Sequence, residues 1–137
     1  MRGAVLMAAI VAFVSAHAEG PDAGSAIEEL ADRPSKVILT SLVSGKHAEI
    51  TDGSEQRDLL TALAQGYRES GHIVEACFNP RHQLHIEKGA KSVDFIICFE
   101  CLQVYARGFG EIGWFTMSRS PEAVFNASLV RHHIAPQ

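Results

Sequence analysis

The sequence predicts an α+β domain in which an antiparallel β-meander sheet is covered on one face by two helices. Two observations support this prediction. Residues 73–117 alternate between apolar and polar side chains with a period of two, and amphipathic helical patterns lie on both sides of that stretch. The length suits one domain with a modest core, which we expect over residues 36–137, after a tail over residues 19–35 that includes a short helix.

The first 18 residues are typical of a cleavable secretory signal peptide. Arg2 supplies a positive start, residues 3–15 carry no charge, and Ala16 and Ala18 place small side chains where a signal peptidase cuts. The apolar run is shorter than the roughly 20 residues that a membrane-spanning helix needs. We therefore expect an exported domain, periplasmic or secreted, with no membrane span after cleavage. A retained N-terminal anchor is the alternative.

The charge and the motif content exclude several classes of function. Without residues 1–18 the chain keeps 11 basic and 16 acidic residues, a net charge near −5 with histidine neutral. The basic stripe that a nucleic-acid partner requires is absent. Phosphate-loop, nucleophile-elbow and paired-carboxylate motifs are also absent, so the sequence favours a protein that is not an enzyme.

The elements before the alternating stretch follow from local signals. Ser25 and Glu28 have the spacing of a capping box and predict a short helix, which Pro34 ends. Residues 37–43 are apolar and β-branched, which is typical of a buried strand. A Ser-Gly-Lys turn then leads to a second short strand through Ile50, so a hairpin is the simplest prediction.

Two amphipathic helices flank the alternating stretch. The first is capped by Asp52 and Glu55, stops near Gly71, and has an apolar face of Leu59, Leu60, Leu63, Ala64 and Tyr67. The second begins at Ser120, where the following proline suits the first turn, and displays Val124, Phe125, Leu129 and Val130. His132 and His133 fall at its end, where we expect them to complement the helix dipole.

The register of the central hairpin follows from a two-residue turn at Gly89 and Ala90. On one face this turn pairs Ile86 with Val93, Leu84 with Phe95 and His82 with Ile97, which brings apolar side chains together and predicts the core face. On the other face it pairs His85 with Asp94, Gln83 with Ile96 and Arg81 with Cys98.

If the alternation continues without a break, it assigns the following residues to faces as well. The predicted core face then holds Val93, Phe95, Ile97, Phe99, Cys101 and Tyr105. The other face holds Asp94, Ile96, Cys98, Glu100, Leu102 and Val104. From a third strand, Trp114 and Ile112 join the core face, opposite Gln103 and Tyr105 respectively.

Cys98 and Cys101 have the C-x-x-C spacing of a redox dithiol or of half a zinc site. In an extended strand, residues three apart point to opposite faces and lie roughly 10 Å apart, too far for a disulfide. A local bridge would need a turn at Phe99 and Glu100, which are poor turn residues. Cys77, which precedes an Asn-Pro turn signal, is therefore the expected disulfide partner of Cys98 or Cys101.

Two other uses of this region stay open. A metal site for a single Zn or Cu ion could draw on Cys77, His82, His85, Cys98 and Cys101, although the register divides these ligands between two faces. A reactive thiol at Cys98 could be activated by Arg81, with His85 oriented by Asp94 as a general base. The simpler alternative for Arg81 is an ion pair with Glu100 or Asp94.

Residues 77–82, Cys-Phe-Asn-Pro-Arg-His, and residues 93–101, which end in Ile-Cys-Phe-Glu-Cys, carry a resemblance. The chain resembles a group of small exported bacterial proteins that share this hairpin and have no assigned function. The resemblance covers about 25 residues and implies that the hairpin is the hallmark of the group. Gln83 departs from the pattern, which has Gly there.

These observations give three hypotheses for function. The first is an exported binding domain with structural cysteines, which recognises another envelope protein through a sheet edge or through the face with Arg81, His85 and Asp94. The second is a zinc- or copper-binding protein. The third is a thiol enzyme or redox protein. Apart from the single metal ion of the second hypothesis, the sequence indicates no cofactor.

Overall fold

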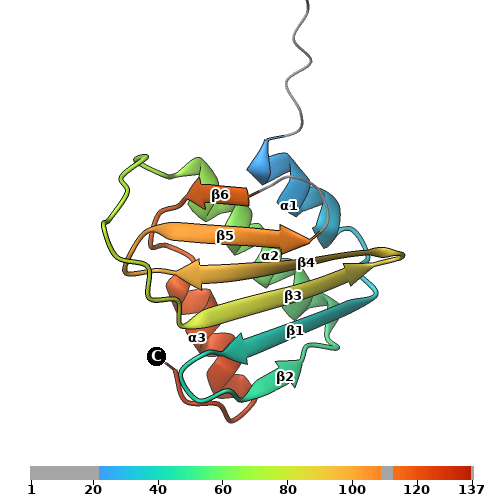
Figure 1. The fold of residues 1–137 in the computed structure, drawn as a ribbon. Helices are drawn as coiled ribbons and strands as arrows, with labels where there is room; N and C mark the ends of the chain where they lie inside the picture. Colours follow the sequence, from blue (N-terminus) through green and yellow to red (C-terminus); the bar gives the residue numbers. More distant parts are fainter. Residues whose placement is uncertain (1–21, 109–112, 137) are drawn as a thin grey trace, which may run out of the picture.

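The structure is a computed structural model that describes residues 22–108 and 113–136 of the chain. Within those residues, three helices cover one face of a six-stranded antiparallel sheet, which Figure 1 shows from its uncovered side. The predicted α+β class and antiparallel sheet are confirmed, with three helices in place of two. The predicted signal peptide lies outside the described residues.

The strands of the sheet lie in the order β2-β1-β3-β4-β5-β6, so that β3 to β6 form the predicted meander and the β1–β2 hairpin continues the sheet beyond β3. The predicted hairpin before residue 50 is confirmed, because β1 pairs antiparallel with β2. The elements are α1 (Ala23–Ala31), β1 (Lys36–Ser41), β2 (His47–Glu49), α2 (Gly53–Arg68), β3 (His82–Lys88), β4 (Lys91–Cys98), β5 (Gln103–Gly108), β6 (Gly113–Thr116) and α3 (Glu122–Arg131).

The predicted register of the β3–β4 hairpin is confirmed for every pair from His82 to Ile86, while Arg81 lies just outside β3. Leu84 lies opposite Phe95 and His85 lies opposite Asp94. Gly89 has a φ of 60°, a backbone conformation that glycine adopts freely and that two-residue hairpin turns require. The predicted apolar face is buried under the helices. We call this the covered face of the sheet, and the opposite one the open face.

The alternation does not continue through residues 99–102, so the faces predicted for Val104 and Tyr105 are wrong. Phe99, which we expected on the core face, is buried in the core. A four-residue turn separates β4 from β5, and Cys98 pairs directly with Gln103. Residues that lie opposite each other in neighbouring strands share a face of the sheet. The even-numbered residues of β5 therefore lie on the same face as the odd-numbered residues of β4. Val104 is in the core, whereas Tyr105 lies on the open face and is only half-buried.

Trp114 also departs from its predicted place. It lies opposite Tyr105 rather than Gln103, a shift of two residues in the register between β5 and β6. Because Tyr105 lies on the open face, Trp114 lies there too, and its side chain is 59% exposed instead of joining the core. Ile112, which we expected beside it, lies outside the described residues.

The predicted helices form close to their expected limits. In α2 the Asp52 side chain accepts a hydrogen bond from the Glu55 N–H at 2.8 Å, as its predicted capping role requires, and the helix ends at Arg68. In α3, Phe125 and Leu129 are buried. The other apolar residues predicted for that face, Val124 and Val130, are exposed.

The short N-terminal helix α1 is the third helix on the covered face. It begins after Asp22, whose side chain accepts a hydrogen bond from the Ser25 N–H at 2.7 Å, and it starts slightly earlier than the capping-box spacing suggests. Ile27 and Leu30 are buried in the core. Across residues 22–108 and 113–136, none of the helices has the length and apolar character needed to cross a membrane.

The packing of α2 against the start of α3 gives a stability prediction. Glycine to alanine usually stabilises a helix, but a Cβ added at Gly66 would lie 2.5 Å from Cγ of Pro121 and 3.3 Å from Cε of Met117. Gly66→Ala should therefore lower the free energy of unfolding by about 1–3 kcal/mol, as overpacking does elsewhere. Urea unfolding followed by circular dichroism measures this change.

Gly53→Ala, in the first turn of the same helix, is the matched control, because nothing lies within 4 Å of its added Cβ. We expect that variant to be neutral or slightly stabilised. Equal effects of the two substitutions would contradict the close approach of α2 and Pro121.

Candidate functional site

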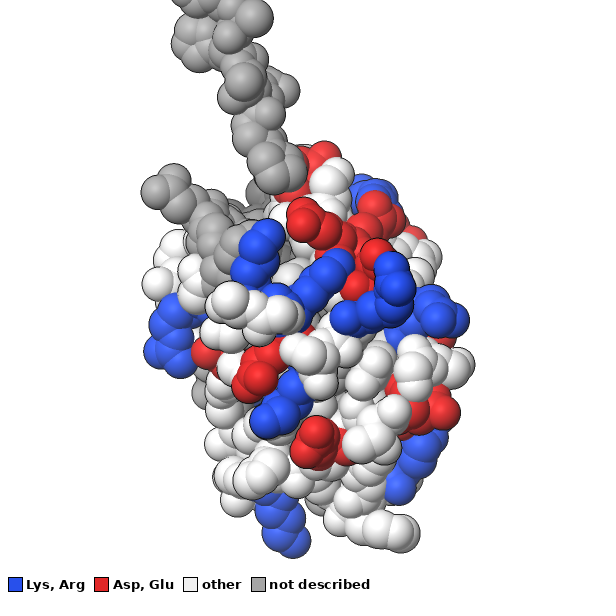
Figure 2. Space-filling view, turned by 90° about the vertical axis from the view of Figure 1, so that its right-hand side faces the viewer, with Lys and Arg blue, Asp and Glu red and all other residues white. Residues whose placement is uncertain are grey.

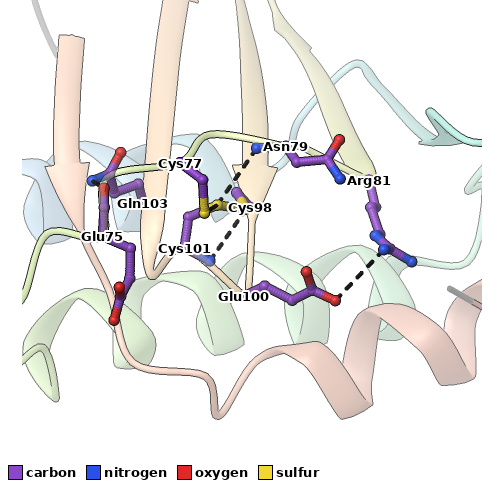
Figure 3. Close-up of a disulfide and its surroundings, with 8 residues drawn as sticks. All are labelled: Glu75, Cys77, Asn79, Arg81, Cys98, Glu100, Cys101 and Gln103. Carbon is purple, nitrogen blue, oxygen red and sulfur yellow. Dashed lines mark hydrogen bonds and ion pairs between the residues drawn. A yellow bond between two sulfur atoms is a disulfide. The ribbon is translucent and has the colours of Figure 1, made fainter.

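The three cysteines of the chain converge where β4 ends and β5 begins. Cys98 is the last residue of β4, and Cys101 lies in the following turn. The turn brings their Cα atoms to 5.1 Å, and the two side chains form a disulfide (Figure 3). The expectation that Cys77 supplies one half of the disulfide is therefore wrong. A turn at residues 99–102 that contains no Gly, Pro, Asn or Asp makes the local bridge possible.

Cys77 nevertheless lies against the disulfide. It belongs to residues 69–81, the connecting segment between α2 and β3, which has no helix or strand. Its Sγ atom is 3.6 Å from the Sγ atom of Cys101. The N–H of Asn79 donates a hydrogen bond to that same Cys101 sulfur at 3.5 Å, and the Gln103 side chain donates to the carbonyl of Glu75 at 3.2 Å (Figure 3). Contacts on both sides of Cys77 thus hold the segment over the ends of the strands.

The three sulfur-bearing side chains differ in their exposure. Cys98 and Cys101 are 1% and 0% exposed, whereas Cys77 is an exposed free cysteine. The N–H of Cys101 also donates a hydrogen bond to the Cys98 sulfur at 3.2 Å. The disulfide is therefore shielded, and the exposed Cys77 thiol lies in contact with one of its sulfur atoms.

Arg81 takes the simpler of the two roles considered for it. Its guanidinium lies 3.6 Å from the carboxylate of Glu100 in the β4–β5 turn (Figure 3). Cys98 carries no free thiol for a cation to activate, because its sulfur is bonded to Cys101. The pair is partly exposed, so we expect it to contribute little to stability.

The five candidate metal ligands do not form one site. His82 points into the covered face, where it packs edge-on against Phe99 and Phe125 and shares a hydrogen bond of 2.9 Å with Asn126. His85 points to the open face, and the Cys98 and Cys101 sulfurs are bonded to each other. Among the residues that the structure describes, no group of three or more His, Cys, Asp or Glu side chains is arranged to hold a metal ion.

His85 and Asp94 are the centre of a polar cluster on the open face. The His85 ring contacts Asp94 at 2.9 Å through Nδ1 and Glu87 at 3.2 Å through Nε2, and Arg107 lies 3.7 Å from Asp94. Burial by itself would lower the pKa of His85, but these hydrogen bonds outweigh it and raise the pKa. Because carboxylates occupy both ring nitrogens, His85 is not placed as a general base with a free nitrogen.

An exposed aromatic group beside this cluster was not predicted from the sequence. Trp114 packs against Tyr105, with ring centroids 4.8 Å apart, and contacts Phe78 of the connecting segment edge-on at 4.8 Å. A cavity of about 280 Å³ adjoins it, lined by Val74, Gln103, Trp114, Phe115 and Thr116. The period-two pattern contained the signal, but the unrecognised turn at residues 99–102 assigned Trp114 and Tyr105 to the wrong face.

A second cluster that was not predicted joins α2 to α3. The Glu55 carboxylate accepts hydrogen bonds from Ser128 and His132 and lies 3.0 Å from Arg131. Burial would raise the pKa of Glu55, but these partners outweigh it and lower the pKa. His132, expected only to complement the helix dipole, thus also pairs with a side chain. A carboxylate held by three partners is a structural tie between the helices.

The pKa values of the two histidines of β3 should be shifted in opposite directions. Burial lowers the pKa of His82, while the carboxylates around His85 raise its pKa. The stabilisation from protonated His85 is complete below its unfolded value of about 6.5 and is lost as the pH rises through its folded pKa. The stabilisation from neutral His82 is complete above about 6.5 and is lost as the pH falls below it.

Imidazole proton shifts in a two-dimensional NMR titration measure both pKa values. Asp94→Asn should lower the pKa of His85 and leave that of His82 unchanged. A higher pKa for His82 than for His85 in the wild type would contradict these two environments.

Comparisons with known proteins give a likeness in fold. The chain is similar to a solved structure described as a "Putative Lipoprotein from Clostridium perfringens", with 13% sequence identity and a TM-score of 0.51. The match covers 83% of this chain and 97% of that one. No family model and no curated protein matches. At this identity the likeness extends to the fold alone.

Proposed function

We propose that this chain is an exported binding domain that recognises another protein through the open face of its sheet. The observation that carries the proposal is the composition of the open face. Trp114, which is 59% exposed, lies there beside two further aromatic rings and a cluster of charged side chains. Cys98 and Cys101 close the β4–β5 turn with their disulfide, which is a structural role in this proposal.

Export is supported by two independent features. Residues 1–18 have the charge, apolar length and small residues of a secretory signal peptide. The similar solved structure is described as a "Putative Lipoprotein from Clostridium perfringens", which fits an exported protein. A disulfide is also compatible with an oxidising compartment outside the cytoplasm.

The aromatic group supplies the kind of contact area that protein interfaces use. Register places Ile96, Tyr105 and Trp114 in one row across β4, β5 and β6. Phe78 adds a fourth apolar side chain from the connecting segment. Tryptophan and tyrosine are enriched at interface hot spots, because they offer large rigid surfaces at small entropic cost. The cavity beside Trp114 could accept an apolar side chain of the partner.

A neighbouring row of charged side chains would orient the partner on the open face. His85, Asp94 and Arg107 lie side by side across β3, β4 and β5. Charged groups at the border of an apolar contact improve specificity and steer association more than they raise affinity. An apolar patch bordered by ion pairs therefore fits a protein surface with one apolar side chain and charged groups around it.

The surface charge favours a protein partner over a nucleic acid. Figure 2 shows the side of the molecule where the β3–β4 turn lies, and there basic and acidic side chains are intermixed. Several are paired, including Lys36 with Glu87 at 4.0 Å and Lys91 with Glu29 at 3.9 Å. A phosphate backbone would need an extended positive surface, which this side does not offer.

Affinity purification from an envelope extract of the source organism, with quantitative mass spectrometry, tests the proposal. Trp114→Ala should remove or weaken the specific partner, by about 2 kcal/mol if Trp114 is a hot spot, which is roughly a 30-fold loss of affinity. Val130→Ala is the matched control, since Val130 is 54% exposed on α3, away from the sheet.

The expected result is a protein retained by the wild type and by Val130→Ala and lost with Trp114→Ala. The same set of proteins on all three baits, or no specific protein on the wild type under native conditions, would refute the open face as the contact surface.

A further inference from the structure

Three sulfur atoms lie together at the ends of β4 and β5, and only one of them is accessible to solvent. The disulfide sulfurs of Cys98 and Cys101 belong to buried residues, while Cys77 is an exposed free thiol. The Cys77 sulfur is 3.6 Å from that of Cys101, which is van der Waals contact between two sulfur atoms. Structural cysteines alone do not require a third thiol in this position.

We propose that these residues form a thiol–disulfide exchange site in which Cys77 is the nucleophile and Cys101 is the sulfur shared by two alternative disulfides. The Cys77 thiol loses its proton to water, and the thiolate attacks the Cys101 sulfur. The Cys77–Cys101 bond forms and the Cys98–Cys101 bond breaks. The electron pair leaves with Cys98, which takes up a proton. One disulfide and one thiol are present before and after, so the step needs no oxidant or reductant.

The connecting segment places the nucleophile. On one side of Cys77, the Glu75 carbonyl is held by the Gln103 side chain at 3.2 Å. On the other side, the Asn79 N–H points at the Cys101 sulfur at 3.5 Å and the Phe78 ring contacts Trp114. These contacts keep Cys77 beside the disulfide, although its segment has no regular secondary structure. Such positioning gives the thiol a high effective concentration at its target.

A backbone hydrogen bond stabilises the leaving group, which is the Cys98 thiolate. When Cys77 attacks Cys101, the negative charge develops on the Cys98 sulfur. The N–H of Cys101 already donates a hydrogen bond to that sulfur at 3.2 Å, and such a bond stabilises a thiolate more than a neutral sulfur. A more stable leaving thiolate departs faster in disulfide exchange. The backbone of the β4–β5 turn thus favours cleavage on the Cys98 side.

The exchange allows small external thiols to reduce a disulfide that is shielded from solvent. In the resting form a thiol such as glutathione cannot reach Cys98 or Cys101, because both are buried. In the exchanged form the Cys77 half of the disulfide is at the surface. An external thiolate then attacks the Cys77 sulfur, forms a mixed disulfide with it and releases the Cys101 thiolate. A second external thiolate then attacks the external sulfur of the mixed disulfide, which forms an external disulfide and releases the Cys77 thiolate. This activity is independent of the proposed partner.

The test is the rate at which reduced glutathione opens the disulfide in the native protein, measured by quenching with N-ethylmaleimide and intact-mass analysis. Cys77→Ser should slow the reduction at least tenfold, because the shielded bridge loses its accessible intermediate. Ile73→Ala, an exposed apolar position on the same segment, should leave the rate unchanged. Equal rates for the wild type and Cys77→Ser would overturn the proposal.

A second variant tests the geometry without kinetics. In Cys98→Ser the two remaining cysteines are the pair that the exchange joins, so air oxidation of the folded protein should give a Cys77–Cys101 bridge, identified by peptide mapping without reduction. Cys77 and Cys101 that both stay alkylatable in that variant under the same conditions would also overturn the proposal.

Discussion

The pairing of β3 with β4 is the constraint on which the rest of the molecule depends. Gly89 turns the chain in two residues, and this fixes Leu84 opposite Phe95 and His85 opposite Asp94. A slip of one residue would move every side chain of a strand to the other face. The buried apolar side chains contribute about 1.5–3 kcal/mol each, so such a slip is prohibitively costly. The same pairing that builds the core therefore also assembles the polar cluster on the open face.

The turn between β4 and β5 decides what the open face contains. Four residues separate Cys98 from Gln103, so the parity of the strand inverts and Tyr105 faces outward. Leu102 has a φ of 55°, a conformation that is unusual for a residue with a side chain. The disulfide from Cys98 to Cys101 spans this turn. Cross-link, turn and outward aromatic residues are thus parts of one local arrangement.

Three local signals in the sequence led to correct predictions. The two-residue turn at Gly89, the capping of α2 by Asp52 and the Ser-Gly-Lys turn each have a stereochemical cause that can be recognised in a few residues. The failures trace to residues 99–102, where Phe, Glu, Cys and Leu carry no turn signal. Treating them as a strand placed Tyr105 in the core and excluded the local disulfide.

The cysteines and the polar cluster were predictable in composition but not in geometry, and the exposed aromatic group around Trp114 was not predicted. Cys77, Arg81, His85, Asp94, Cys98 and Cys101 were all identified from the sequence. The hairpin register correctly predicted that His82 points to the covered face and His85 to the open face. The contact between Cys77 and Cys101 and the packing of Phe78 on Trp114 depend on a segment without helix or strand, whose path is set by tertiary contacts. Periodicity gives no information about such a segment.

The sheet is divided into a covered face, which holds the buried core, and an open face, which we propose as the surface that contacts a partner. Trp114 is the one tryptophan in the sequence, so its fluorescence reports on the open face alone. Quenching by acrylamide in the native protein tests the division most directly. We predict a quenching constant at least half that of the urea-unfolded chain. A native tryptophan that acrylamide hardly quenches would place Trp114 in a core and contradict the account.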